Sequence, residues 1–263
     1  MNELQYDDGC VVDESAFRKF SEEADCMTVA NDGDVLINKA ATGVIPTELQ
    51  YDGPAAGIAS LIEEDNKRKM AELQYNDELH TYSVNGEILP NVTEILKSGG
   101  LTHFDNIPTS RQEESKVRGS YVHLATELYD KGTLNEDTLD SGLLGYLAAW
   151  KNFKVEANFK VAMIEQRGYS EKWRYAGTWD RTGLLNNKLA LLDIKSGKID
   201  EKATRVQTAA YLALAFDYKK ETTRYAVQLK DDGTYRLSEP WTNYALDFSI
   251  FLSCLKIYRF KNL

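Results

Sequence analysis

Two aspartates and a lysine within residues 175–197 have the types and spacing of a divalent-cation site. Asp193 interrupts an apolar run and Lys195 follows two positions later, so in a strand both side chains project to one face while Ile194 points into the core. A carboxylate in an apolar strand is costly without a partner, which favours a functional Asp193. Asp180 ends the preceding extended run, and taken alone it fits a turn or strand-end residue better.

A hairpin would bring these groups together. Residues 184–189 are predicted to form a hairpin connection with Asn186 and Asn187 as plausible turn residues, which would return Asp180 beside Asp193. Mg²⁺ typically binds one or two carboxylates, water and substrate phosphate, so two aspartates on adjacent strands suit it. Three roles are open for Lys195, namely an ion pair, the orientation of a water, or stabilisation of charge on a phosphate oxygen.

Further candidates lie in a predicted helix upstream. His123 follows Arg118-Gly119, and Glu127 one turn later is placed to accept a proton from the imidazole ring. A lone histidine in a helix is more often structural than functional. A glycine inside a helix costs up to about 1 kcal/mol relative to alanine, which suggests that another group approaches the backbone closely at this position.

Gln207 and Tyr211 lie one turn apart in the helix predicted after the Asp193 strand. Both side chains have the chemistry to contact phosphate or to order a neighbouring group. Tyr211 fits equally well in the core, because its neighbours are alanine and leucine. The local sequence leaves these two interpretations open.

The elements that must position these residues alternate between strands and helices. Strands are predicted at 79–84, 87–89, 160–166, 171–180, 189–195, 224–230 and 234–237, with an Asn85-Gly86 turn in the first hairpin. Helices are predicted at 93–98, 110–131, 140–157, 203–217 and 242–258. This order predicts an α/β fold with a mixed sheet.

Residues 1–75 differ from the rest of the chain. They hold 16 acidic and 6 basic side chains, whereas 76–263 hold 25 of each and 151–263 hold 20 basic against 13 acidic. The net charge of -10 therefore argues little against a nucleic-acid partner. Helices are predicted at 13–27 and 55–70. Glu-Leu-Gln-Tyr occurs at 3–6, 48–51 and 72–75, and both chance with local duplication and a repeated docking element explain it.

The sequence also indicates the cellular compartment. No apolar run approaches the length of a membrane span and the chain starts with acidic residues, so we expect a cytoplasmic protein without a membrane partner. The cysteines, Cys10, Cys26 and Cys254, are widely spaced. They favour reduced thiols and supply no clustered ligands for zinc or an iron–sulfur cluster.

Taken in order, four motifs resemble the PD-(D/E)XK nuclease superfamily, and most closely its RecB-like exonuclease branch, which includes phage nucleases and the mitochondrial genome-maintenance exonuclease. The motifs are His123 after Arg-Gly, Gly177-Thr178-Trp179-Asp180, Asp193-Ile194-Lys195-Ser196-Gly197, and Gln207-x-x-x-Tyr211. The likeness covers about residues 76–230, including the hairpin around Asn85-Gly86. None of these motifs is specific for the superfamily by itself. The ordered set of motifs, with an interval of 13 residues from Asp180 to Asp193, is specific.

The resemblance implies a restriction-endonuclease-like core, a central mixed sheet flanked by helices, in residues 76–263. Residues 1–75 would be an acidic extension without a counterpart in the family. The implied ligands of Mg²⁺ or Mn²⁺ are His123, Asp180, Asp193 and the Ile194 carbonyl, and Glu165 falls where many members carry an acid. Some members hold an iron–sulfur cluster through four cysteines, which this chain does not have.

The resemblance further implies that Lys195 assists the attacking water and that Gln207 and Tyr211 orient the site and contact DNA. We therefore expect a metal-dependent DNA exonuclease that hydrolyses linear single- or double-stranded DNA in phage or bacterial recombination, repair or replication. The alternatives are a catalytically silent or regulatory protein of the same fold, and an endonuclease.

Contacts with DNA are expected from basic and aromatic side chains of the nuclease domain. The candidates are Arg118, Trp173, Arg174 and Arg205. Trp173 and the neighbouring Tyr175 fit equally well as core residues of an ordinary strand. The acidic residues 1–75 are expected to bind a recombination or replication protein, or to shield the basic half of the chain until DNA displaces them.

Overall fold

The computed structural model describes residues 73–77, 79–102, 109–216 and 222–263. The helices expected at 13–27 and 55–70 and the first two copies of the tetrapeptide lie outside these residues. None of the helices within the described ranges is long and apolar enough to cross a membrane.

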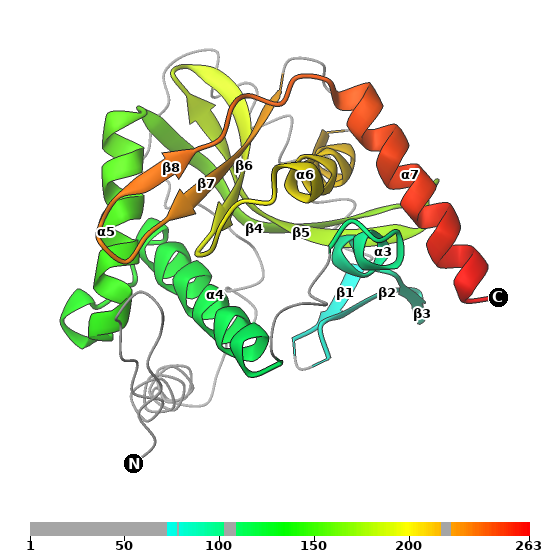
Figure 1. The fold of residues 1–263 in the computed structure, drawn as a ribbon, viewed down its shortest axis with the longest axis horizontal. Helices are drawn as coiled ribbons and strands as arrows, with labels where there is room; N and C mark the ends of the chain where they lie inside the picture. Colours follow the sequence, from blue (N-terminus) through cyan, green and yellow to red (C-terminus); the bar gives the residue numbers. More distant parts are fainter. Residues whose placement is uncertain (1–72, 78, 103–108, 217–221) are drawn as a thin grey trace.

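A five-stranded mixed sheet forms the centre of the described domain (Figure 1). Its strands, in spatial order, are β4 (Phe159–Ser170), β5 (Tyr175–Leu185), β6 (Lys188–Lys195), β7 (Thr223–Leu229) and β8 (Tyr235–Leu237). The β6–β7 pair is parallel and the other pairs are antiparallel. Helix α6 (Glu201–Phe216) provides the crossover that the parallel pair requires. The α/β fold with a mixed sheet is therefore confirmed.

The β5–β6 hairpin closes as expected. Asn186 and Asn187 adopt positive φ angles of 49° and 63°, which a two-residue type I′ turn requires. From the turn, the antiparallel register runs to the pair Arg181↔Leu192. Asp180 and Asp193 follow directly beyond this last pair. Asp180 Oδ2 accepts a hydrogen bond from the Ile194 N–H, and its charge acts on Asp193, so the two carboxylates are neighbours.

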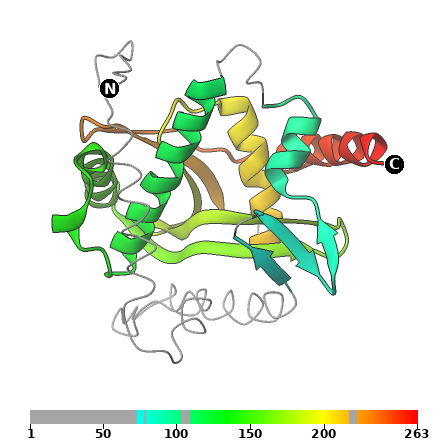
Figure 2. The same cartoon turned by 90° about the horizontal axis from the view of Figure 1, so that it is seen from below.

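Helices pack on both faces of β6. The helices are α3 (Val92–Ser98), α4 (Thr109–Asp130), α5 (Ser141–Glu156), α6 and α7 (Tyr244–Lys261), with a short 3₁₀ turn at Glu136–Thr138. Leu191 belongs to a core built with α3, α6 and α7, whereas Leu192 and Ile194 belong to a core built with α4 and α5. Figure 2 shows α4, α6 and α3 in a row over β4 and β5.

A smaller antiparallel sheet packs beside β4 and β5. It consists of β1 (Leu73–Asn76), β2 (Thr81–Val84) and β3 (Glu87–Leu89). Tyr82 and Val84 form a core with Tyr169 and Ala176 of the large sheet. The sequence did not predict β1, which begins before the boundary expected at residue 75 and contains part of the third tetrapeptide copy.

The strand predicted at 160–166 is longer in the structure and ends at Ser170. The strand predicted at 171–180 lies further along the chain, at Tyr175–Leu185. Residues 171–174 form the turn, closed by a hydrogen bond from Arg174 N–H to the Ser170 carbonyl at 2.7 Å, and β5 continues to Leu185. The strand expected to end at Asp180 continues through Arg181 and Thr182. Both side chains are fully buried, because Arg181 Nε donates to Asp130 of α4 and Thr182 Oγ1 accepts a hydrogen bond from Trp179 Nε1 of the same strand. Most other predicted elements differ from the structure by one to three residues at their ends.

Candidate metal centre

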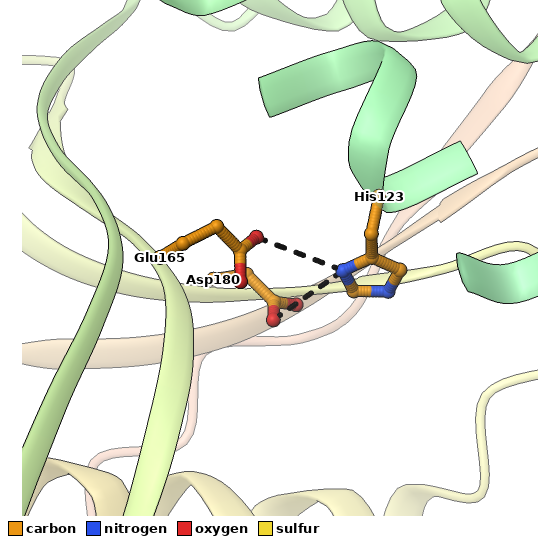
Figure 3. Close-up of side chains that lie close together, drawn as sticks. All are labelled: His123, Glu165 and Asp180. Atoms are coloured by element: carbon orange, nitrogen blue, oxygen red, sulfur yellow. Dashed lines mark ion pairs between the residues drawn. The ribbon is translucent and has the colours of Figure 1, made fainter. Parts of the chain in front are cut away.

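Three side chains from three elements converge on one point (Figure 3). His123 comes from α4, Glu165 from β4 and Asp180 from β5, and their potential ligand atoms all lie within 4.8 Å of one another. His123 Nδ1 lies 3.5 Å from Asp180 Oδ1 and 3.8 Å from Glu165 Oε1. The His123 side chain is 30% exposed and that of Glu165 is 21% exposed, so an ion can reach the cluster from solvent.

The register of the large sheet places Glu165 opposite Asp180. The pairs Ile164↔Arg181 and Gln166↔Trp179 flank this position. Glu165 has a φ of 46°, in the left-handed region that residues other than glycine adopt at an energetic cost. Backbone strain of this kind concentrates at functional sites, where the surrounding contacts maintain it.

The Asp180 side chain is held in place through the carboxylate oxygen that does not face His123. Its Oδ2 accepts a hydrogen bond from the Ile194 N–H at 2.5 Å. The Ile194 side chain is fully buried in the core, as expected from its position between Asp193 and Lys195. The cluster is thereby attached to β6, and the role of the Ile194 carbonyl as a ligand stays a prediction.

Asp193 and Lys195 project together, as the strand periodicity predicted. Lys195 Nζ forms an ion pair with Asp193 Oδ2 at 2.8 Å and donates a hydrogen bond to Gln207 Oε1 at 3.2 Å. Gln207 Nε2 in turn donates to the Tyr211 hydroxyl at 3.0 Å. Asp193 lies outside the group of three ligand atoms around His123, and its Oδ2 pairs with Lys195.

Gly177 leaves room for the Tyr211 ring. A Cβ atom at Gly177 would lie 2.8 Å from Tyr211 Cε1. The glycine in the Gly-Thr-Trp-Asp motif therefore allows α6 to bring Tyr211, and with it Gln207, against β5.

Burial and neighbouring charges set the protonation of this site. Burial lowers the pKa of His123, but the charge of Asp180 and the hydrogen bond and charge of Glu165 outweigh it and raise the pKa to about 9. Burial raises the pKa of Asp193 to about 6, although Lys195 opposes this shift. Burial likewise raises the pKa of Asp180. For Lys195, the lowering by burial is exceeded by the raising effects of Asp193 and Asp180.

The donor set fits a divalent cation. One imidazole nitrogen and two carboxylates lie close enough for one ion to contact all three. The carboxylates of Asp180 and Asp193 are buried beside each other, and burial raises the pKa of both. A bound cation would offset that unfavourable concentration of negative charge.

Two expectations about α4 are wrong in detail. Glu127 does not contact His123; its Oε1 accepts a hydrogen bond from Lys131 Nζ at 2.5 Å, one turn further along the helix. At Gly119 the nearest group of the described chain is Ser196 Oγ, which an added Cβ would meet at 3.6 Å, an ordinary contact that does not require a glycine. An alanine side chain would therefore fit at this position, one turn before His123, in ordinary contact with Ser196.

The candidates for DNA contact are dispersed. Arg118 is partly buried on α4, and its buried Nε has no hydrogen-bond partner among the described residues. Trp173 packs against the core in the β4–β5 turn, and Arg174 beside it pairs with Glu87. Arg205 Nε donates to Asp247 Oδ1 at 2.8 Å.

The structure therefore gives Trp173, Arg174 and Arg205 partners within the fold. It does not gather them at the cluster, and their contact with DNA stays a prediction. Tyr175 is fully buried and donates a hydrogen bond to the Ala210 carbonyl at 2.9 Å, which supports the core interpretation of this residue.

Sequence reasoning missed the groups that surround Glu165. Arg181 Nη1 donates to Glu165 Oε1 at 2.9 Å, and Arg181 Nε donates to Asp130 Oδ2 at 2.8 Å. Asp130, at the end of α4, looks in sequence like a solvated helix-end residue, yet its side chain is 1% exposed. The signal available in the sequence was that apolar residues follow soon after Arg181, which indicates that the strand continues past the arginine and buries it.

Comparisons with known proteins add little to this geometry. No model of a known protein family matches the chain, and no curated protein matches it. One solved structure, titled "Crystal structure of SSO0001", is similar with a TM-score of 0.31 and 14% sequence identity, over 79% of this chain and 88% of that one. A likeness this weak does not establish a shared fold.

Proposed function

We propose that this protein is a divalent-cation-dependent deoxyribonuclease that removes nucleotides from the ends of linear DNA. The observation that carries the proposal is the convergence of His123, Glu165 and Asp180 within 4.8 Å, beside a lysine that Asp193 and Gln207 hold in place. The ordered motifs of the sequence support a restriction-endonuclease-like core as the finer description of the fold.

In this proposal His123, Glu165 and Asp180 hold one Mg²⁺ or Mn²⁺, with Asp193 and the Ile194 carbonyl as further candidate ligands. When bound, the cation supplies Lewis-acid activation of water and of the scissile phosphate. The hydrogen bond from Ile194 N–H holds Asp180 in the orientation that points its other oxygen at His123. The strands thus preorganise the ligands.

Lys195 acts as a fixed positive charge. Its pKa is raised, because the effect of Asp193 and Asp180 exceeds that of burial, so the ammonium keeps its proton at neutral pH. It donates to a phosphate oxygen or to the attacking water and stabilises charge that develops there. This electrostatic role is favoured over proton abstraction. Its side chain is 30% exposed, which leaves it accessible to substrate.

Gln207 and Tyr211 orient the lysine. Gln207 links the Lys195 ammonium to the Tyr211 hydroxyl, and Tyr211 itself is buried against Gly177. The chain of hydrogen bonds fixes the amide of Gln207 with its oxygen toward Lys195. DNA affinity would come from phosphate contacts by the basic residues of 151–263, together with Arg118, and would depend little on base sequence.

The test uses end-labelled linear DNA and closed circular DNA incubated with Mg²⁺ or Mn²⁺. Progressive loss of linear DNA alone is expected, and Asp180→Asn and Asp193→Ala should abolish it. Asp137→Asn, which alters an exposed carboxylate on the turn between α4 and α5, is the matched control and should retain activity. Cleavage of circles would indicate an endonuclease, and absence of cation-dependent loss of either DNA would indicate a catalytically silent protein.

A further inference from the structure

Arg181 is a fully buried cation that contacts the candidate metal centre from the side of the core. Its Nη1 donates to Glu165 Oε1 at 2.9 Å and to the Asp180 carbonyl at 2.7 Å. Its Nε donates to Asp130 Oδ2 at 2.8 Å, and its Nη2 donates to Thr126 Oγ1 at 3.3 Å. Four acceptors on three elements therefore fix the guanidinium plane.

Asp130 extends this network to α5. It accepts hydrogen bonds from Trp150 Nε1 at 3.1 Å and from Lys154 Nζ at 2.6 Å, in addition to the one from Arg181. The charges alternate in sign from Lys154 through Asp130 and Arg181 to Glu165. Each buried charge is thus paired, which is the condition under which such groups are tolerated in a core.

We propose that Arg181 is a positioning residue that holds the Glu165 carboxylate in the cation site. The inference rests on the proposed function, because it requires that a cation binds there. Glu165 has a strained φ of 46°, so its backbone needs contacts that maintain it. Arg181 supplies such a contact through the side chain, from a guanidinium that four acceptors immobilise.

The positioning role of Arg181 and its positive charge predict opposite effects on cation affinity when the arginine is replaced. The guanidinium is a positive charge that contacts a ligand of the cation, so through space it weakens cation binding. If electrostatics alone mattered, Arg181→Met would tighten binding. If Arg181 acts by positioning Glu165, Arg181→Met weakens binding in spite of the removed repulsion, and Arg181→Lys weakens it although the charge is kept.

The experiment measures Mn²⁺ affinity of the full chain by electron paramagnetic resonance and by calorimetry, with thermal unfolding of each variant. We expect Arg181→Lys to bind Mn²⁺ about 10- to 100-fold more weakly, the usual range for partners of metal ligands. Arg224→Lys is the matched control: Arg224 is also fully buried and pairs with an aspartate, Asp247, at 2.7 Å, away from the cation cluster. It should lower the unfolding temperature and leave Mn²⁺ affinity unchanged.

A double-mutant cycle shows whether Arg181 acts through Glu165. In a Glu165→Gln background, Arg181→Lys should weaken Mn²⁺ binding by less than about twofold, because the carboxylate that it positions is gone. Thr126→Val replaces Arg181→Lys if that variant does not fold; it removes one acceptor of the guanidinium and also the hydrogen bond from Thr126 to the His123 carbonyl. We expect at least about twofold weaker binding, and this loss should diminish in the Glu165→Gln background if Thr126 acts through Arg181.

Unchanged or tighter Mn²⁺ binding in Arg181→Lys, or in Thr126→Val where that variant replaces it, would overturn the positioning role alone. So would an undiminished loss in the Glu165→Gln background. Absence of Mn²⁺ binding by the unaltered protein would overturn the positioning role and the proposed function together, so the two failures are distinguishable.

Discussion

His123 is the residue at which the structure changes the chemistry most. In sequence it was a helical histidine with Glu127 as its expected partner. In the structure it faces Glu165 and Asp180, and their charges raise its pKa to about 9 in spite of burial. At neutral pH it therefore carries a proton that a cation must displace.

The pH dependence of cation binding follows from that proton. Below a pH of about 9 the imidazole is mostly protonated, so Mn²⁺ affinity should rise as pH increases toward 9, by at most about tenfold per pH unit, and binding at neutral pH should release about one proton. Calorimetry in two buffers of different ionisation enthalpy measures the proton release.

His123→Gln should bind Mn²⁺ more weakly with a flatter pH dependence over the same range. An equally steep dependence in that variant would show that another group titrates. Asp193, with a pKa raised to about 6, contributes in a lower window, because it becomes ionised as pH rises through 6.

At the scale of elements, two glycines inside helices differ in how closely other elements pack against them. A Cβ at Gly119 in α4 would meet Ser196 Oγ at 3.6 Å, whereas one at Gly145 in α5 would lie 1.6 Å from the Asp231 carbonyl oxygen. Gly119→Ala should therefore stabilise the protein by about 0.5–1 kcal/mol through helix propensity.

Gly145→Ala should instead destabilise the protein by about 1–3 kcal/mol, because the β7–β8 turn must move. Urea unfolding of both variants measures the difference. Destabilisation by Gly119→Ala would show that the space beside α4 is filled. If Gly119→Ala is stable but binds DNA more weakly, substrate approaches this part of the helix.

Helix α7 is joined to the sheet by a buried ion pair. Asp247, 1% exposed, accepts from Arg224 Nη2 on β7 at 2.7 Å and from Arg205 Nε on α6 at 2.8 Å. Asp247→Ala leaves the fully buried Arg224 without its carboxylate, so we expect a loss of about 3–5 kcal/mol in the free energy of unfolding. A loss below about 1 kcal/mol in urea unfolding would contradict this role.

At the scale of the whole molecule, charge is divided unevenly along the chain. Residues 1–75 carry 16 acidic and 6 basic side chains, and 151–263 carry 20 basic and 13 acidic. Because β1 begins at Leu73, a deletion of residues 1–72 leaves the small sheet complete. The deletion should increase DNA affinity at low salt, since it removes an acidic competitor of DNA.

Fluorescence anisotropy with labelled DNA over a range of salt concentrations measures this effect. The gain should diminish as salt rises, because screening shortens the range of the interaction to about 10 Å near 0.1 M. Equal affinities of the full and shortened chains at every salt concentration would exclude shielding and would leave partner binding as the expectation for this segment.

The sequence by itself determined the features that depend on neighbouring residues. Strand periodicity placed Asp193 and Lys195 on one face and Ile194 in the core, and the Asn186-Asn187 turn set the register that brings Asp180 beside Asp193. These features follow from local backbone geometry, which a short stretch of sequence specifies.

Only the tertiary structure decided the partners of these groups. His123 meets Glu165 and Asp180, and Arg181 is buried between Asp130 and Glu165, because α4, β4 and β5 pack against one another. Such contacts join residues far apart in sequence, and a buried arginine in a strand looks like a strand end until its acceptors are known. The sequence therefore determines the positions of the two aspartates of the cation site. Tertiary packing brings His123, Glu165 and the guanidinium of Arg181 to them.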